Sequence, residues 1–291
     1  MVHRTGFLKS IITMESPVIE ALSDILQYQF MRHALMTGLL VSIACGIIGT
    51  FVVVKRIVFL SGGISHTAYG GIGIGYYLGI NPIIGAIVFS LAAAFGIAWV
   101  RQNASQREDT LIGVMWATGM AIGIMFIDKT PGYAPNLMTY LFGNILAVPT
   151  SDLILMAVLN ILIISVTILL FKELKAFTFD EEYSAISGVP VTVLNIILFC
   201  MIALTVVILI RAVGIILVIA LLAIPPATIV QFRFSLKKTM IFSMIIGAAF
   251  ITFGLLISAA YDLTSGATII IVACAGYVVS LLIRPLLKRA V

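Results

Sequence analysis

Lysine and arginine recur in every second gap between the long apolar runs of this 291-residue chain. Hydrophobic residues make up 62% of the sequence and charged residues only 10%, which is far from the composition of a water-soluble globule. Short cytoplasmic loops of membrane proteins carry an excess of Lys and Arg, so the alternation indicates a polytopic membrane protein. Most of the seventeen cations belong to this set: Lys55, Arg56, Arg101, Arg107, Lys172, Lys175, Arg233, Lys237, Lys238, Arg284, Lys288 and Arg289.

Nine apolar segments reach or approach the length of about 20 residues that a helix needs to cross a bilayer. The sixth and seventh are separated only by Arg211, so we expect a tight turn between Arg211 and Gly214. We also expect Pro225-Pro226 to break or kink the seventh segment. The predicted fold class is therefore all-α, with about nine transmembrane helices. They cover residues 33–54, 62–80, 83–100, 110–127, 152–171, 190–210, 212–231, 239–260 and 266–284.

Nine crossings place the C-terminus in the cytoplasm with the charged loops and the N-terminus outside. Residues 1–31 are predicted to be an N-terminal amphipathic or interfacial segment, because apolar residues recur on one helical face after Ser16-Pro17. Residues 32–291 are predicted to form one transmembrane domain, in which 130–148 supply an external loop and a short interfacial or re-entrant helix. The net charge of +5 follows this topology and does not indicate a nucleic-acid surface.

Several function classes are disfavoured by residues that the chain lacks. None of its twelve Asp and Glu residues lies in the middle of a span, whereas ion-coupled carriers commonly place carboxylates at membrane depth. It has no GxxxxGK[ST] phosphate loop and no HExxH motif. A passive channel is disfavoured because no ring of pore charges is evident. A transporter of this composition takes its energy from another polypeptide.

His66 is the one ionisable side chain predicted to lie deep in a span. Such a group indicates a functional site, although a neutral histidine bonded to a neighbouring carbonyl explains it equally well. Gly62, Gly70 and Gly73 share its helical face, and small residues there let another helix approach closely. An intramembrane enzyme that uses His66 would need a partner nucleophile or a second metal ligand at depth, and none is evident.

Two polar segments at the ends of spans are further candidates. Residues 179–188 lie in the longest cytoplasmic loop, with acidic residues suited to a helix start and Gly188 suited to its end. That helix could dock a soluble partner or be a solvated connector. Glu108-Asp109-Thr110 opens the fourth span, where we prefer plain capping as the explanation.

Five motifs, in order along the chain, resemble those of the permeases of ABC transporters that import zinc, manganese or iron. The resemblance runs from about residue 28 to the C-terminus. It rests on Gly62-Gly63-Ile64-Ser65-His66-Thr67, on Glu108-Asp109-Thr110-Leu111-Ile112-Gly113, on Phe179 to Gly188, on Val213-Gly214 through Pro225-Pro226-Ala227, and on Ser265-Gly266-Ala267.

The resemblance implies a permease homodimer of the type II importer kind in a bacterial or archaeal cell (inner) membrane. It implies a separate cytosolic ABC ATPase dimer that binds ATP, and an extracytoplasmic metal-binding protein that delivers a divalent metal as cargo. No permanently bound cofactor and no enzymatic activity of this chain is expected. Within the cytoplasmic loop 172–189, the coupling helix that meets the ATPase is expected to use Phe179, Asp180, Glu181, Glu182, Ala185 and Gly188.

One departure from the family pattern lies beside the histidine. Family members resembling this chain carry Asp four residues before it, where this chain has Gly62. The remaining candidate ligands on the transport pathway are His66 and the hydroxyls of Ser61 and Ser65, a weak set that allows an ion to leave as well as enter. Because the carboxylate is missing, the cargo could instead be a different cation, or a metal chelate such as haem, a siderophore or cobalamin. Gly62, Gly70, Gly113, Gly214, Pro225 and Pro226 are expected in structural or gating roles, together with the Glu108-Asp109-Thr110 segment.

Overall fold

The computed structural model describes residues 28–103, 108–131, 140–141 and 143–289. Its described residues form helices and connecting turns without a strand, so the predicted all-α class is confirmed. The amphipathic helix expected within residues 1–31 lies almost wholly outside the described residues, as do residues 132–139 of the expected external loop.

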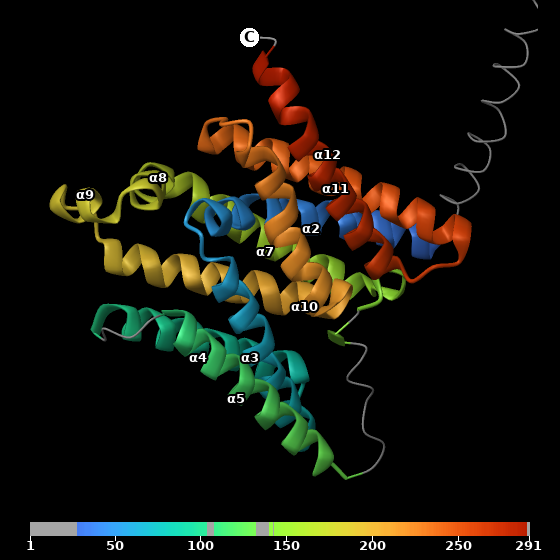
Figure 1. Ribbon diagram of the computed structural model, residues 1–291. Helices are drawn as coiled ribbons and strands as arrows, with labels where there is room; N and C mark the ends of the chain where they lie inside the picture. Colours follow the sequence, from blue (N-terminus) through green and yellow to red (C-terminus); the bar gives the residue numbers. More distant parts are fainter. Residues whose placement is uncertain (1–27, 104–107, 132–139, 142, 290–291) are drawn as a thin grey trace, which may run out of the picture.

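Figure 1 labels the helices of the described part of the chain. They are α2 (Gln29–Val54), α3 (Val58–Tyr77), α4 (Pro82–Asn103), α5 (Glu108–Asp128), the 3-10 turn η1 (Ile145–Ala147), α7 (Thr150–Leu169), α8 (Phe171–Phe179), α9 (Glu181–Ile186), α10 (Val191–Val230), α11 (Leu236–Tyr261) and α12 (Ser265–Arg289).

Seven helices in the described part of the chain are long and apolar enough to cross a membrane, so the predicted count of nine is approximate. These helices are α2, α4, α5, α7, α10, α11 and α12. The difference has two sources. Helix α3 has the length of a span, but glycines, serines and His66 lower its hydropathy. The two segments predicted at 190–210 and 212–231 are joined in α10, which is 40 residues long.

Helix α10 changes direction at Gly214, where the backbone has φ 78° and ψ 161°. Glycine reaches this region because it has no Cβ, and other residues are essentially excluded from it. The two halves of α10 run in clearly different directions, as Figure 1 shows. Gly143 packs against the backbone of Val213 and Gly214 so closely that a Cβ would have no room. The turn predicted between Arg211 and Gly214 is thus confirmed.

The break or kink expected at Pro225-Pro226 is not a break, because α10 continues through both prolines and Gly214 is its one non-helical residue. A proline in a helix leaves the carbonyl four residues earlier without its usual donor, which for Pro226 is the carbonyl of Leu222. The backbone of α2 meets that carbonyl at Gly49, where no side chain intervenes. Close packing by a neighbouring helix therefore accommodates the proline pair within α10.

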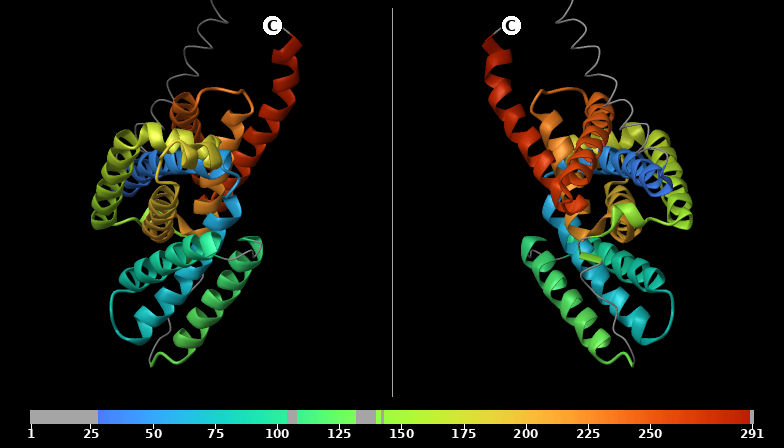
Figure 2. Two further views of the ribbon diagram at one scale, coloured as in Figure 1. Left: turned by 90° about the vertical axis from the view of Figure 1, so that its left-hand side faces the viewer. Right: turned by 90° about the vertical axis from the view of Figure 1, so that its right-hand side faces the viewer.

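Helices α3, α4 and α5 form a group of their own beside the rest of the bundle (Figure 2). Their contacts depend on glycine. Gly71 of α3 meets the backbone of Gly85 in α4, and Gly73 meets the backbone of Gly123 in α5. In a bilayer such close backbone approach, and not hydrophobic burial, drives the association of helices. The glycine-rich sequence of α3 therefore serves to hold it between two neighbours.

The main core lies along α2 and the first half of α10, where Phe51, Phe199 and Ile202 are fully buried. The cation-rich gaps of the sequence come together at one end of this core. Residues from three of them, Val54, Phe179 and Arg233, line a single pocket there. Arg211 marks the opposite end, where its Nε lies 3.1 Å from Oδ2 of the nearly buried Asp152 at the start of α7.

Candidate functional site

The segment after α8 forms the short helix that the sequence predicted. The side chain of Asp180 accepts a hydrogen bond from the backbone N–H of Tyr183 at 2.9 Å, which caps the start of α9. Glu181 and Glu182 occupy the first turn, where negative charge favours the positive end of a helix. Gly188 follows the helix with φ 82°, the left-handed conformation that commonly ends helices at glycine.

Exposed apolar side chains gather on α9 and at the end of α8. Phe179, Tyr183 and Ile186 are exposed, and Ile186 retains 86% of its accessible surface. Ala185 and Glu182 are exposed beside them. Large apolar residues grouped at the tip of a polar segment are typical of a protein–protein contact. The sequence predicted contact roles for Phe179, Glu182 and Ala185 but missed Tyr183 and Ile186, whose exposure depends on how α9 is turned.

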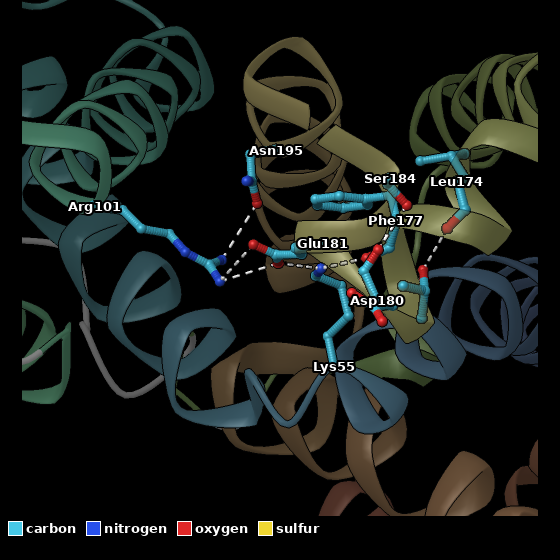
Figure 3. A network of polar contacts seen from close by, with 9 residues as sticks. Lys55, Arg101, Leu174, Phe177, Asp180, Glu181, Ser184 and Asn195 are labelled. Atoms are coloured by element: carbon cyan, nitrogen blue, oxygen red, sulfur yellow. Dashed lines mark hydrogen bonds and ion pairs between the residues drawn. The ribbon is translucent and has the colours of Figure 1, made fainter. Parts of the chain in front are cut away.

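The other side of α9 is tied to the transmembrane helices through Glu181 (Figure 3). Its Oε1 lies 2.5 Å from Nζ of Lys55 and 3.0 Å from Nη2 of Arg101. Nη1 of Arg101 also donates to Oδ1 of Asn195 at 3.2 Å. One carboxylate thus joins α9 to the end of α2 and the last turn of α4, and Arg101 extends the network to the start of α10.

Lys55 is the most enclosed member of this network, with only 3% of its side chain exposed. Its ammonium also donates to the backbone carbonyl of Phe177 at 3.2 Å and lies 3.4 Å from the centroid of the Phe177 ring. A desolvated cation over an aromatic face gains electrostatic stabilisation. Lys55 lies three residues before α3 begins at Val58, so its contacts join α8 and α9 to the entry of α3.

The imidazole of His66 lies on α3 against the indole of Trp116 on α5. The rings are stacked, with centroids 4.0 Å apart and an angle of 9° between their planes. His66 is half-buried, and its Nδ1 is buried without a hydrogen-bond partner in the part of the chain that the structure describes. The alternative of a histidine satisfied by a neighbouring carbonyl is therefore not supported at Nδ1. A free ring nitrogen can bind a metal ion or accept a proton.

The two predicted serine ligands are less available than His66. Ser61 and Ser65 are fully buried, and their hydroxyls donate to the carbonyls of Val58 and Ser61 at 2.8 and 2.7 Å. Gly62, which stands where the family has Asp, has only the Trp116 ring near its missing side chain, 3.8 Å from an ideal Cβ. Among the described residues of a single chain, no group of three His, Cys, Asp or Glu side chains could hold a metal.

The start of α5 holds the second predicted motif. Asp109 and Thr110 are exposed there, while the side chain of Glu108 lies outside the described part. Gly113 has open space where a side chain would be, and Gly70 lies against Phe89 and the carbonyl of Gly119. Among the described side chains, Asp109 and Thr110 join neither the Glu181 network nor the contact between His66 and Trp116.

Lys55, Arg101 and Trp116 were also not predicted at these sites. Lys55 and Arg101 carried a signal, since both are cations at the ends of spans, but that signal was interpreted as topology alone. Trp116 carried none, because a single tryptophan in an apolar segment does not reveal which residue it faces.

Comparison with known proteins identifies the family of this chain. The model of the ABC 3 transport family matches residues 27–284. An uncharacterized membrane protein of Synechocystis sp. is 51% identical over 267 residues, 92% of this chain and 95% of that protein. The manganese transport system membrane protein MntC of Listeria monocytogenes is 34% identical over 264 residues, 91% of this chain and 94% of that protein.

A solved structure shows the same fold. PsaBC from Streptococcus pneumoniae, in complex with Fab, matches with a TM-score of 0.81 and 30% sequence identity, over 90% of this chain and 95% of the other. The resemblance carried by the five sequence motifs is confirmed by these matches. The chain is a multi-pass membrane protein that belongs to the ABC 3 transport family.

Proposed function

We propose that this chain is the membrane-spanning permease subunit of an ATP-driven importer of divalent transition metal ions, with manganese and zinc as the first candidates and iron as the third. Membership of the ABC 3 transport family and the likeness to MntC over nearly the whole length support this cargo class. ATP is hydrolysed by a separate cytosolic ATPase dimer and not by this chain, whose sequence holds no phosphate loop.

The observation that carries the proposal is the two-sided construction of α9. Its outer side exposes Tyr183 and Ile186 for the ATPase, and its inner side holds Glu181 against Lys55 and Arg101. A helix that only connected two spans would need neither feature. When ATP binding closes the ATPase dimer, α9 moves with it, and the charged contacts pull on the ends of α2 and α4 together.

The path of the ion runs beside α3 in this mechanism. Lys55 precedes α3, and the glycine contacts of α3 let it slide against α4 and α5 without a clash of side chains. As α3 and α5 shift, the position of the His66 ring relative to the Trp116 ring changes. The imidazole is a ligand that binds the ion briefly. Because it is a single ligand within one chain, it also favours release of the ion.

A second copy of the chain completes the pathway. Helices α5 and α12 bury the smallest share of their most apolar stretch within one chain, 22% each. Both are spans with uncovered small and apolar faces, and α5 carries Trp116. Pairing two copies along α5 and α12 brings the two His66 side chains toward a shared axis, where an extracytoplasmic metal-binding protein delivers the ion.

The end of the bundle that holds α9 faces the cytoplasm in this proposal. The excess of Lys and Arg at that end supports the assignment. The Arg211–Asp152 pair then faces outside, close to the turn of α10 at Gly214. With the C-terminus inside and the N-terminus outside, the chain sits in a bacterial or archaeal cell (inner) membrane.

Replacing His66 with alanine is expected to lower metal uptake at limiting metal by about tenfold or more, since loss of a metal-binding contact typically costs that factor in affinity. Uptake of radioactive Mn²⁺ by cells that express the complete transporter measures the effect. Ser65→Ala is the matched control, because its hydroxyl is occupied by the Ser61 carbonyl. Unchanged uptake in His66→Ala, at equal membrane abundance, would remove His66 from the pathway.

A further inference from the structure

Helix α2 packs between α7 and α11 (Figure 2). A groove lined by residues of these three helices and of α8 lies on the side of the bundle. Its volume is about 470 Å³. Side chains of α7 and α8 form one wall and side chains of α11 form the other, with Ile47 of α2 at the back. The apolar lining residues include Ile164, Ile168, Phe171, Met240, Ile241 and Met244.

Two polar groups interrupt this apolar lining. Lys237, in the first turn of α11, lines the groove and has an exposed side chain. Thr167, near the end of α7, is the second polar lining residue, and its hydroxyl is itself buried. An apolar body with a cation at one end matches an amphiphile with an anionic head.

The position of the groove indicates the bilayer as the source of that amphiphile. It opens near the start of α11 and the end of α7, at the cation-rich end of the bundle. Ile168 keeps 70% of its accessible surface, so the groove is open to the lipid phase along α7. Neither α5 nor α12, the helices proposed to face a second copy, contributes a lining residue. Basic pockets between transmembrane helices on the cytoplasmic side bind anionic lipid head groups.

We propose that this groove is a binding site for one anionic phospholipid. An acyl chain lies between α7 and α11 against Met240 and Met244, and the phosphate is paired with the ammonium of Lys237. Because Phe171 begins α8, which leads to α9, the bound lipid also supports the base of the coupling segment.

Native mass spectrometry of the full-length chain in detergent tests the head-group contact, with phosphatidylglycerol titrated against phosphatidylcholine of the same acyl chains. We expect preferential retention of phosphatidylglycerol. Lys237→Gln should weaken its binding about fivefold, since one Lys near the membrane surface contributes about 1 kcal/mol. Lys238→Gln is the control, an exposed neighbour that does not line the groove. Equal loss in both variants would show general charge attraction and overturn the site.

A second pair of variants tests the groove itself without altering charge. Ile168→Trp fills it, whereas Ile161→Trp adds the same side chain two turns earlier on the exposed side of α7, outside the lining. The retained phosphatidylglycerol should fall for Ile168→Trp, because the indole occupies the space of the acyl chain, and should stay at the wild-type level for Ile161→Trp. Retention unchanged in Ile168→Trp would overturn the proposal. A loss of the dimer in Ile168→Trp, with lipid retention unaffected, would assign the groove to a second copy and overturn it as well.

Discussion

Replacing Glu181 with glutamine is expected to reduce metal transport about 30-fold while the transporter still assembles and hydrolyses ATP. The substitution keeps the size of the side chain and removes the charge that Lys55 and Arg101 contact at 2.5 and 3.0 Å. Hydrogen bonds to charged groups contribute about 2 kcal/mol once the partial exposure of the carboxylate is allowed for. That difference corresponds to about 30-fold in the equilibrium constant between docked and undocked α9.

The informative measurement is the number of metal ions transported per ATP hydrolysed, in proteoliposomes that contain the chain and its ATPase. A purely structural role for Glu181 would lower both rates together and leave this ratio unchanged. Glu173→Gln is the matched control, because Glu173 is a half-buried carboxylate in the first turn of α8 that belongs neither to the Glu181 network nor to the exposed contact surface. A wild-type ratio in Glu181→Gln would contradict the role assigned to the network.

Gly214→Ala is expected to destabilise the fold by about 3 kcal/mol, because alanine cannot reach φ 78° and ψ 161° without strain. Relief of the strain would straighten α10 and disrupt its contact with Gly143. The expected result is a lower midpoint of thermal unfolding in detergent, with a smaller fraction of monodisperse protein. Loss of the bend also separates Arg211 from Asp152, so transport should fall in the protein that remains folded.

Gly96→Ala provides the comparison for this prediction. Gly96 lies inside α4 with open space where a Cβ would be, so alanine there should be neutral or stabilise the helix by up to about 1 kcal/mol. A thermal midpoint for Gly214→Ala equal to that of Gly96→Ala would show that the bend is not required for the fold.

The apolar helices and the short helix α9 could be predicted because they depend on local sequence. Apolar length and the alternation of cations indicated the spans, and the acidic start and Gly188 indicated the limits of α9. Gly214 was found because an unbroken apolar run from Pro190 to Gln231 is too long for one crossing. The conformation of α10 at Pro225-Pro226 was harder to predict, because the helix continues there through close packing against a glycine of α2.

The arrangement of the functional side chains could not be predicted because it depends on contacts between distant residues. Glu181 meets Lys55 across 126 positions and Arg101 across 80, and neither pairing leaves a pattern in one sequence. The sequence assigned Glu181 to contact with the ATPase, whereas its carboxylate points into the permease (Figure 3). The orientation of Trp116 over His66 and Gly62 depends in the same way on how α3 packs against α5.

Transport of Mn²⁺ into proteoliposomes, measured with and without the cytosolic ATPase, tests the central claim most directly. We predict that vesicles containing the chain alone take up Mn²⁺ no faster than empty vesicles do. Addition of the ATPase, ATP and the metal-binding partner should produce uptake that stops when ATP is replaced by a non-hydrolysable analogue. Metal movement by the chain alone, at the rate of the complete assembly, would contradict a gate driven through α9.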